Sequence, residues 1–231
     1  MTAGRHVPAT LARMTVAAVI LSASAESAIA ETLGQPRVRR LADIGWSGGA
    51  LPIVVLAPDP DGAVTASLVG SEAIYGLPAL PDSGPVGQMV RGTELAMAEV
   101  GDTTAVLMWP AAMTWVGPET ITSLIEAHGT AREAMLRPTW HDQPGWPVLV
   151  PTRHLDALRS IAPDRMPPDV IDDLSGLMPT RAIAVGDPGV VFDVETDPAD
   201  LPVYEGPPDP PAGHTHEWGA SVMTEAGLGE P

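Results

Sequence analysis

The sequence TVAAVIL at residues 15–21 decides the fold. Six apolar residues follow Thr15 without interruption, and the small residues Ser22, Ala23 and Ser24 come directly after them. A short continuous apolar run of this kind is typical of a strand that is buried on both faces of a parallel sheet. We therefore predict that residues 15–21 form the opening strand of an α/β domain.

A second interpretation of the same run is a secretory signal. Arg5 and Arg13 precede it, and A-x-A sequences at residues 23–25 and 28–30 follow it as candidate cleavage sites. In that case the protein is secreted and loses its first strand, and the local sequence leaves both interpretations open. The run is too short to cross a bilayer, which takes about 20 apolar residues, so we do not expect an integral membrane protein.

Apolar runs and helical patterns alternate along the rest of the chain. The runs predict strands at residues 51–57, 73–75, 104–108, 135–138, 147–150, 181–185 and 189–194. The helical patterns fall at residues 36–46, 63–69, 84–100, 117–128, 153–161 and 168–178. Such alternation predicts an α/β fold, with a mostly parallel sheet in a three-layer, Rossmann-like arrangement.

The length of 231 residues and a hydrophobic content of 45% suit one domain with an extension. We place the domain at residues 14–201 and a proline-rich, acidic tail at residues 202–231. Of the 29 acidic residues, 14 lie from Asp164 onward, beside only two arginines. We expect a solvated, partly disordered tail, with a partner-binding tail as the alternative.

The charged residues exclude several kinds of chemistry. The net charge is −17, all 12 basic residues are arginine, and the chain has neither lysine nor cysteine. A Schiff base, a thiol nucleophile, a disulfide and a cysteine zinc site are therefore impossible. We do not expect nucleic acid as a partner, because binding it requires a basic surface.

Five stretches, taken in order, resemble the MobA-like NTP transferases, within the nucleotide-diphospho-sugar transferase fold. The first, AAVILSAS at residues 17–24, is similar to the family's first strand and nucleotide loop. Residues 84–87 (GPVG) resemble its base-binding loop, and residues 113–121 (MTWVGPETI) fall at the junction that carries its metal-binding aspartate. Residues 145–149 (GWPVL) and 193–201 (DVETDPADL) are similar to its Gly-His-Pro stretch and its closing motif.

The resemblance implies a nucleotidyltransferase that moves GMP or CMP from a nucleoside triphosphate, with Mg²⁺, to molybdopterin. It also implies a cytoplasmic protein with a molybdoenzyme partner, and it favours a strand over a signal peptide at residues 15–21. It makes Asp193 the candidate catalytic acid. The residues that it assigns to nucleotide binding are Leu21, Ser22, Ala23, Ser24, Gly84, Pro85 and Gly87.

Several positions depart from the family pattern. Ser24 and Ala28 stand where the loop normally has glycine and arginine, and Ala112 stands at the metal aspartate. Glu26 adds a negative charge to the loop, and the chain has no lysine to offset it. Two hypotheses therefore stay open. One is an active, divergent transferase, and the other is a silent nucleotide- or pterin-binding protein that acts through a partner and uses backbone amides such as that of Ser22.

Three further groups each have a structural alternative. Asp193 and Glu195, two apart near a strand end, could share a cation, or Asp193 could serve as a turn carboxylate. The segment GHTHEW at residues 213–218 offers His214, His216 and Glu217 as metal ligands, or it is simply an exposed part of the tail. Trp146 could stack on a flat ligand, or it could belong to the core.

Overall fold

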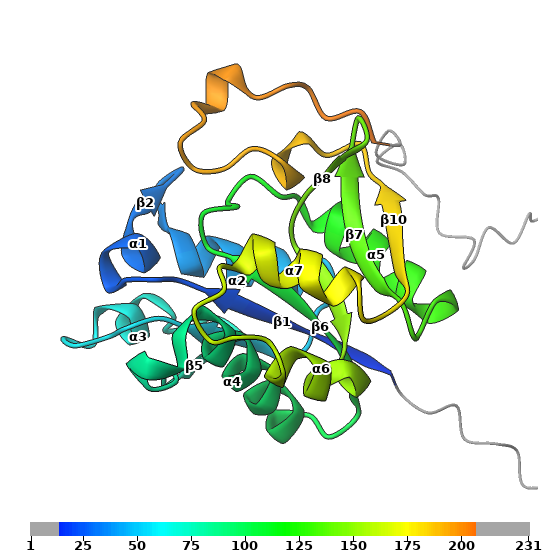
Figure 1. The fold of residues 1–231 in the computed structure, drawn as a ribbon. Helices are drawn as coiled ribbons and strands as arrows, with labels where there is room; N and C mark the ends of the chain where they lie inside the picture. Colours follow the sequence, from blue (N-terminus) through cyan, green and yellow to red (C-terminus); the bar gives the residue numbers. More distant parts are fainter. Residues whose placement is uncertain (1–13, 207–231) are drawn as a thin grey trace, which may run out of the picture.

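The structure is a computed structural model that describes residues 14–206. It contains one large mixed sheet, shown in Figure 1. The strands of this sheet are β1 (Thr15–Leu21), β4 (Ile53–Leu56), β5 (Ala73–Gly76), β6 (Thr103–Pro110), β7 (Met135–Trp140), β8 (Gln143–Pro144), β9 (Val148–Pro151) and β10 (Thr180–Ala184). Two short strands, β2 (Glu31–Thr32) and β3 (Gln35–Pro36), form a separate hairpin.

Helices connect most of the strands. They are α1 (Ala25–Ile29), α2 (Arg37–Ser47), α3 (Ala63–Ser67), α4 (Gly84–Glu99), α5 (Pro118–Thr130), α6 (Leu155–Arg159) and α7 (Pro167–Ser175). Single turns of 3₁₀ helix lie at Pro81–Ser83, Thr152–His154, Pro188–Val190 and Pro198–Asp200. Proline at a first helical position starts both α5 and α7, as expected for a residue that has no amide hydrogen to leave unpaired.

The strand order across the sheet is β10-β7-β9-β6-β1-β4-β5, so strand β1, at residues 15–21, lies near the middle. Strand β1 pairs in parallel with β4 and β6, and Leu21 lies opposite both Leu56 and Pro110. The carboxyl ends of these three strands therefore meet at one edge of the sheet. Strand β9 runs antiparallel to both of its neighbours, which makes the sheet mostly rather than wholly parallel.

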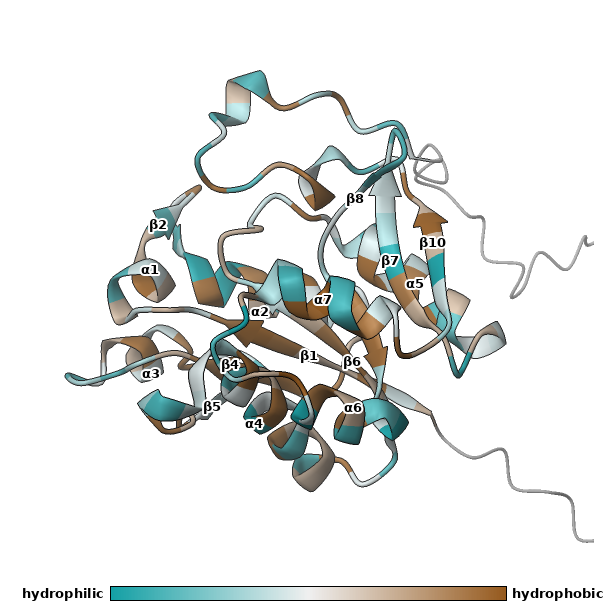
Figure 2. Ribbon diagram, in the orientation of Figure 1, coloured by the Kyte–Doolittle hydropathy of each residue, from teal (hydrophilic) through white to brown (hydrophobic). Residues whose placement is uncertain are grey.

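Alternate residues of β1 serve the two faces of the sheet. Ala18 and Ile20 are buried in the core beneath α2 and α5, whereas Ala17 and Val19 are buried in the core beneath α4, α6 and α7. Figure 2 shows these central strands as the most hydrophobic part of the fold. Gly92 brings α4 close to the sheet, because any side chain there would overlap Val19. The predicted three-layer α/β fold is confirmed.

The predicted strand at residues 189–194 is wrong. Residues Pro188–Val190 form a 3₁₀ turn, since the Asp187 carboxylate accepts a hydrogen bond from the Gly189 amide at 2.8 Å. The Trp115 backbone packs against Gly189 so closely that a side chain would not fit. These tertiary contacts override the apolar composition of the segment.

The segment after β1 also differs from a glycine-type phosphate loop. It forms helix α1, because the Ser24 hydroxyl accepts a hydrogen bond from the Ser27 amide at 3.0 Å and caps the first turn. Among residues 14–206, no helix has the length and apolar character needed to span a bilayer. His214, His216 and Glu217, and most of the predicted tail, lie outside the described residues.

Candidate functional site

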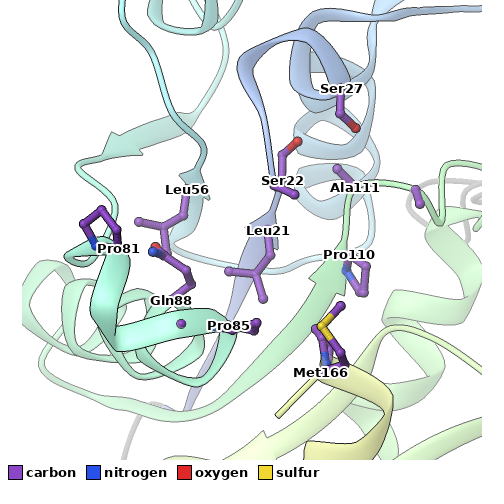
Figure 3. A pocket seen from close by; sticks show the side chains of 14 residues that line it. Leu21, Ser22, Ser27, Leu56, Pro81, Pro85, Gln88, Pro110, Ala111 and Met166 are labelled. Carbon is purple, nitrogen blue, oxygen red and sulfur yellow. The ribbon is translucent and has the colours of Figure 1, made fainter. Parts of the chain in front are cut away.

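A cavity of about 440 Å³ opens where the carboxyl ends of β1, β4 and β6 meet. Ligands of open α/β sheets bind at this edge, because the loops that follow the strands converge there. Figure 3 shows Leu21 near the middle, with Gln88 and Met166 on opposite sides. The lining residues are Leu21, Ser22, Ala23, Ser27, Leu56, Pro81, Gly84, Pro85, Gln88, Pro110, Ala111, Ala112, Met166 and Pro167.

Five of the seven residues expected to bind a nucleotide line this cavity, namely Leu21, Ser22, Ala23, Gly84 and Pro85. The other two, Ser24 and Gly87, do not line it. Ser24 caps α1, and Gly87 packs so closely on Ser83 that a side chain would overlap it. The structure thus brings most of the predicted set together and gives the remaining two residues structural roles.

The polar groups of Ser22 are already used by the fold. Its amide donates a hydrogen bond to the Leu56 carbonyl at 2.9 Å, and its hydroxyl donates to the Ser24 carbonyl at 3.0 Å. The expectation that the Ser22 amide holds a phosphate or a base is therefore wrong. The Gln88 amide is also engaged, since it pairs with both the nitrogen and the oxygen of Ala79.

Within the described residues 14–206, no acidic, basic or histidine side chain lines the cavity. Ala111 and Ala112 form the wall at the place where the metal-binding aspartate was expected. Across residues 14–206, no three histidine, aspartate or glutamate side chains come close enough together to hold a metal ion. Magnesium prefers carboxylate oxygens, so the residues present do not fit a Mg²⁺ ion at this site.

Asp59 follows the end of β4, yet its carboxylate is occupied. It accepts hydrogen bonds from the Thr65 hydroxyl at 2.6 Å and from the amides of Val64 and Thr65 at 2.8 and 3.0 Å. The hydrogen bond from the Thr65 hydroxyl is the main cause that lowers the pKa of Asp59. Asp59 thus caps helix α3 and does not line the cavity.

Asp193, the candidate catalytic acid, lies beside the cavity through its backbone. The Val194 amide donates to the carbonyl of Ala112 at 2.8 Å, and Trp115 Nε1 donates to the carbonyl of Asp193 at 2.6 Å. The Asp193 carboxylate, however, accepts from the Glu195 amide at 3.0 Å in a local turn. The segment is not a strand, so the prediction that Asp193 and Glu195 point to the same side at a strand end and share a cation is wrong. The alternative, that Asp193 is a turn carboxylate, agrees with this hydrogen bond.

The tryptophans among residues 14–206 lie outside the cavity lining. Trp146 is half-buried between the two cores, and its amide donates to the Val190 carbonyl at 2.8 Å. Trp109 is fully buried and donates from Nε1 to the Met113 carbonyl at 2.9 Å. Trp115 lines a neighbouring hollow of about 380 Å³, beside Leu33 and Val194. The proposed stacking by Trp146 therefore has no contact with this cavity to support it.

The motifs did not assign every residue that lines the cavity. Leu56 and Pro110 could have been predicted from the sequence, because they end the strands on either side of β1. Met166 and Pro167, in contrast, reach the cavity from the start of α7, and no motif marks them. Their position depends on how α7 crosses the sheet.

Comparisons with known proteins agree with this geometry. Residues 28–177 match the model of the family described as the MobA-like NTP transferase domain. No curated protein sequence gives a significant match.

Several solved structures share the fold. A nucleotidyl transferase from Methanothermobacter is 15% identical with a TM-score of 0.60, covering 78% of this chain and 91% of that chain. The 2-C-methyl-D-erythritol 4-phosphate cytidylyltransferase from Thermus thermophilus is 16% identical with a TM-score of 0.58, covering 81% and 96%. Rv0371c from Mycobacterium tuberculosis, solved as a complex with manganese, is 18% identical with a TM-score of 0.57, covering 74% and 88%.

Proposed function

Because the chain belongs to the MobA-like NTP transferase family, we propose that it binds a nucleotide or a pterin in the cavity at the strand ends without transferring a nucleotidyl group. One observation carries the proposal. The cavity occupies the edge of the sheet where this fold class binds ligands, yet no ionisable side chain from the described part of the chain lines it.

Nucleotidyl transfer depends on positioning the phosphates and neutralising their charge with metal ions and cationic side chains. This cavity has alanine at both wall positions after β6, and the chain has no lysine. The residues that line the cavity therefore include no ligand for a metal ion that could stabilise the charge that a triphosphate develops in the transition state. Binding survives this loss more readily than catalysis, because binding does not need that charge to be stabilised.

The walls suit the flat part of such a ligand. Leu21, Pro85 and Met166 present apolar surface, and a cavity of about 440 Å³ lies in the range of small-molecule sites. A purine, a pyrimidine or a pterin ring fits this description. In this proposal the protein is cytoplasmic and acts on a partner enzyme, such as a molybdoenzyme, by holding or presenting the ligand.

Family membership supports a second candidate, an active transferase that moves GMP or CMP to molybdopterin with Mg²⁺. Its strongest structural support is the hydrogen bond that the Val194 amide donates to the carbonyl of Ala112, a residue of the cavity wall. Asp193 directly precedes Val194 in the sequence. For Asp193 to act, its carboxylate would have to give up the hydrogen bond from the Glu195 amide and rotate toward the cavity.

Calorimetric titration with GTP, CTP and a pterin, each with and without magnesium, separates the two candidates. The binding proposal expects the same affinity in both conditions and no release of pyrophosphate. Ala23→Trp would fill the exposed mouth of the cavity and abolish binding, whereas Ala66→Trp, on the exposed side of α3, would leave it unchanged. Magnesium-dependent binding with pyrophosphate release would establish the transferase, and no binding of any nucleotide or pterin would rule out both.

A further inference from the structure

Arg37, the first residue of α2, is a buried cation beside the cavity. The residue as a whole is 8% exposed. Its Nη1 donates a hydrogen bond to the Ser27 hydroxyl oxygen at 2.9 Å, and Ser27 lines the cavity. The guanidinium therefore lies directly behind one wall of the candidate site.

This guanidinium lacks a counter-ion within the described part of the chain. No carboxylate between residues 14 and 206 comes within 4.0 Å of it, and its buried Nε has no hydrogen-bond partner. Arg39, two residues later, is paired with a carboxylate as arginines commonly are: its Nε donates to both oxygens of Asp43 at 3.0 and 3.1 Å. In a chain of net charge −17, an unpaired buried arginine is a costly exception.

A second arginine, Arg40, lies one helical turn away and also has no ion pair with a carboxylate of residues 14–206. Arg40 Nε donates to the Thr114 carbonyl at 3.3 Å, in the loop that begins with the cavity wall residues Ala111 and Ala112. Burial lowers the pKa of both Arg37 and Arg40. Two partly or fully buried positive charges on α2 thus face the loops that follow β1 and β6.

Ser27 connects Arg37 to the cavity. Because its oxygen accepts a hydrogen bond from Arg37, its own hydroxyl hydrogen must point elsewhere and is available to donate. A hydroxyl that donates in front of a guanidinium is a good anion-binding arrangement, since hydrogen bonds near a positive charge are stronger than neutral ones. The positive charge that is absent from the loop after β1 is supplied here by a different element.

We propose that Arg37 and Ser27 form an anion subsite of this cavity that takes a phosphate group of its ligand. The inference rests on the proposed function and makes it more specific, because the ligand must then be a phosphorylated nucleoside or pterin rather than a neutral one. Arg37 acts through Ser27 as a positioning residue, and the subsite binds without a metal ion.

Calorimetry without magnesium tests the subsite by comparing each nucleoside with its monophosphate, guanosine with GMP and cytidine with CMP. The wild-type protein should bind a monophosphate about tenfold more tightly than its nucleoside, as expected for a hydrogen bond to a charged group. Arg37→Met should remove this preference and leave the nucleoside affinity unchanged. Ser27→Ala should reduce the preference.

Arg39→Met is the matched control. It removes the same charge from the same helix, but Arg39 pairs with Asp43 and does not contact a cavity residue, so the preference for the monophosphate should persist. Should Arg37→Met fail to fold, Arg37→Lys, which keeps the charge, should retain part of the preference and Arg37→Gln should lose it.

The outcomes distinguish this inference from the proposed function. Tight nucleoside binding with no preference for phosphate, or with a preference that survives Arg37→Met, overturns the subsite and leaves the proposed function standing. If no nucleoside or nucleotide binds, the proposed nucleotide function fails, and inorganic phosphate then tests the subsite alone. At constant ionic strength phosphate should raise the Tm of the wild type and of Arg39→Met but not of Arg37→Met, and an equal shift in all three overturns the subsite.

Discussion

The carboxylate of Asp187 accepts a hydrogen bond from the hydroxyl of Thr120, 67 residues earlier in the chain, at 2.7 Å. The same Oδ2 accepts from the Gly117 amide at 2.8 Å, and Oδ1 accepts from the Gly189 amide at 2.8 Å. Asp187 is 4% exposed and so caps the start of α5 from inside the protein. This contact fastens the segment after β10, which includes Asp193, to the helix that follows the cavity loop.

Asp187→Ala should therefore lower the free energy of unfolding by about 2–4 kcal/mol, because it leaves three donors without their acceptor in the interior. Asp187→Asn, which keeps one acceptor oxygen, should cost less. Urea denaturation measures both, with Asp172→Ala as the control, since Asp172 forms an exposed ion pair with Arg137. A loss below about 1 kcal/mol for Asp187→Ala would show that the cap is not needed.

His128 should make stability depend on pH. It is 1% exposed, and burial, followed by the charge of Arg132, lowers its pKa from the ordinary value. Below about pH 6.5 the unfolded chain binds a proton there that the folded chain does not, so stability is full above this pH and falls as pH decreases. In urea melts between about pH 5 and pH 7.5, His128→Gln should flatten this decrease. Equal slopes in the two proteins would contradict the assignment.

Ala112→Asp should introduce a metal response. Ala112 lines the cavity, and a carboxylate at this wall would provide the oxygen ligand that Mg²⁺ needs. Without magnesium, the new negative charge should weaken the binding of GTP or CTP, and magnesium should restore it. Ala112→Asn, equal in size and uncharged, should show neither effect in the same calorimetric titration. If the aspartate variant is insensitive to magnesium, this wall does not face the ligand's phosphates.

Gly84→Ala should disturb the cavity from its α4 side. Gly84 has φ of +58°, and a side chain there would collide with the Pro163 carbonyl. The variant should lose about 1–3 kcal/mol of stability and bind nucleoside more weakly. Gly101→Ala is the matched control, since open space surrounds that position. Unchanged stability and affinity in Gly84→Ala would mean that this loop can move away from Pro163 without affecting the site.

The sequence by itself determined the architecture. The continuous apolar run at residues 15–21 and the strand and helix patterns after it predict an α/β sheet, because apolar periodicity is a local property of the chain. The resemblance to the family assigned Leu21, Ala23, Gly84 and Pro85 to nucleotide binding, and these residues line one cavity. The resemblance to the family rested on the same stretches, and the family match agrees with it.

Only the tertiary structure decided which side chains act at that edge. It turned residues 188–190 into a 3₁₀ turn, placed Met166 over the cavity and left Trp146 between the cores. It also put the Arg37 guanidinium behind Ser27, which no spacing in the sequence indicates. The physical reason is that these contacts depend on how helices and loops from distant parts of the chain cross, whereas strand and helix patterns depend on near neighbours alone.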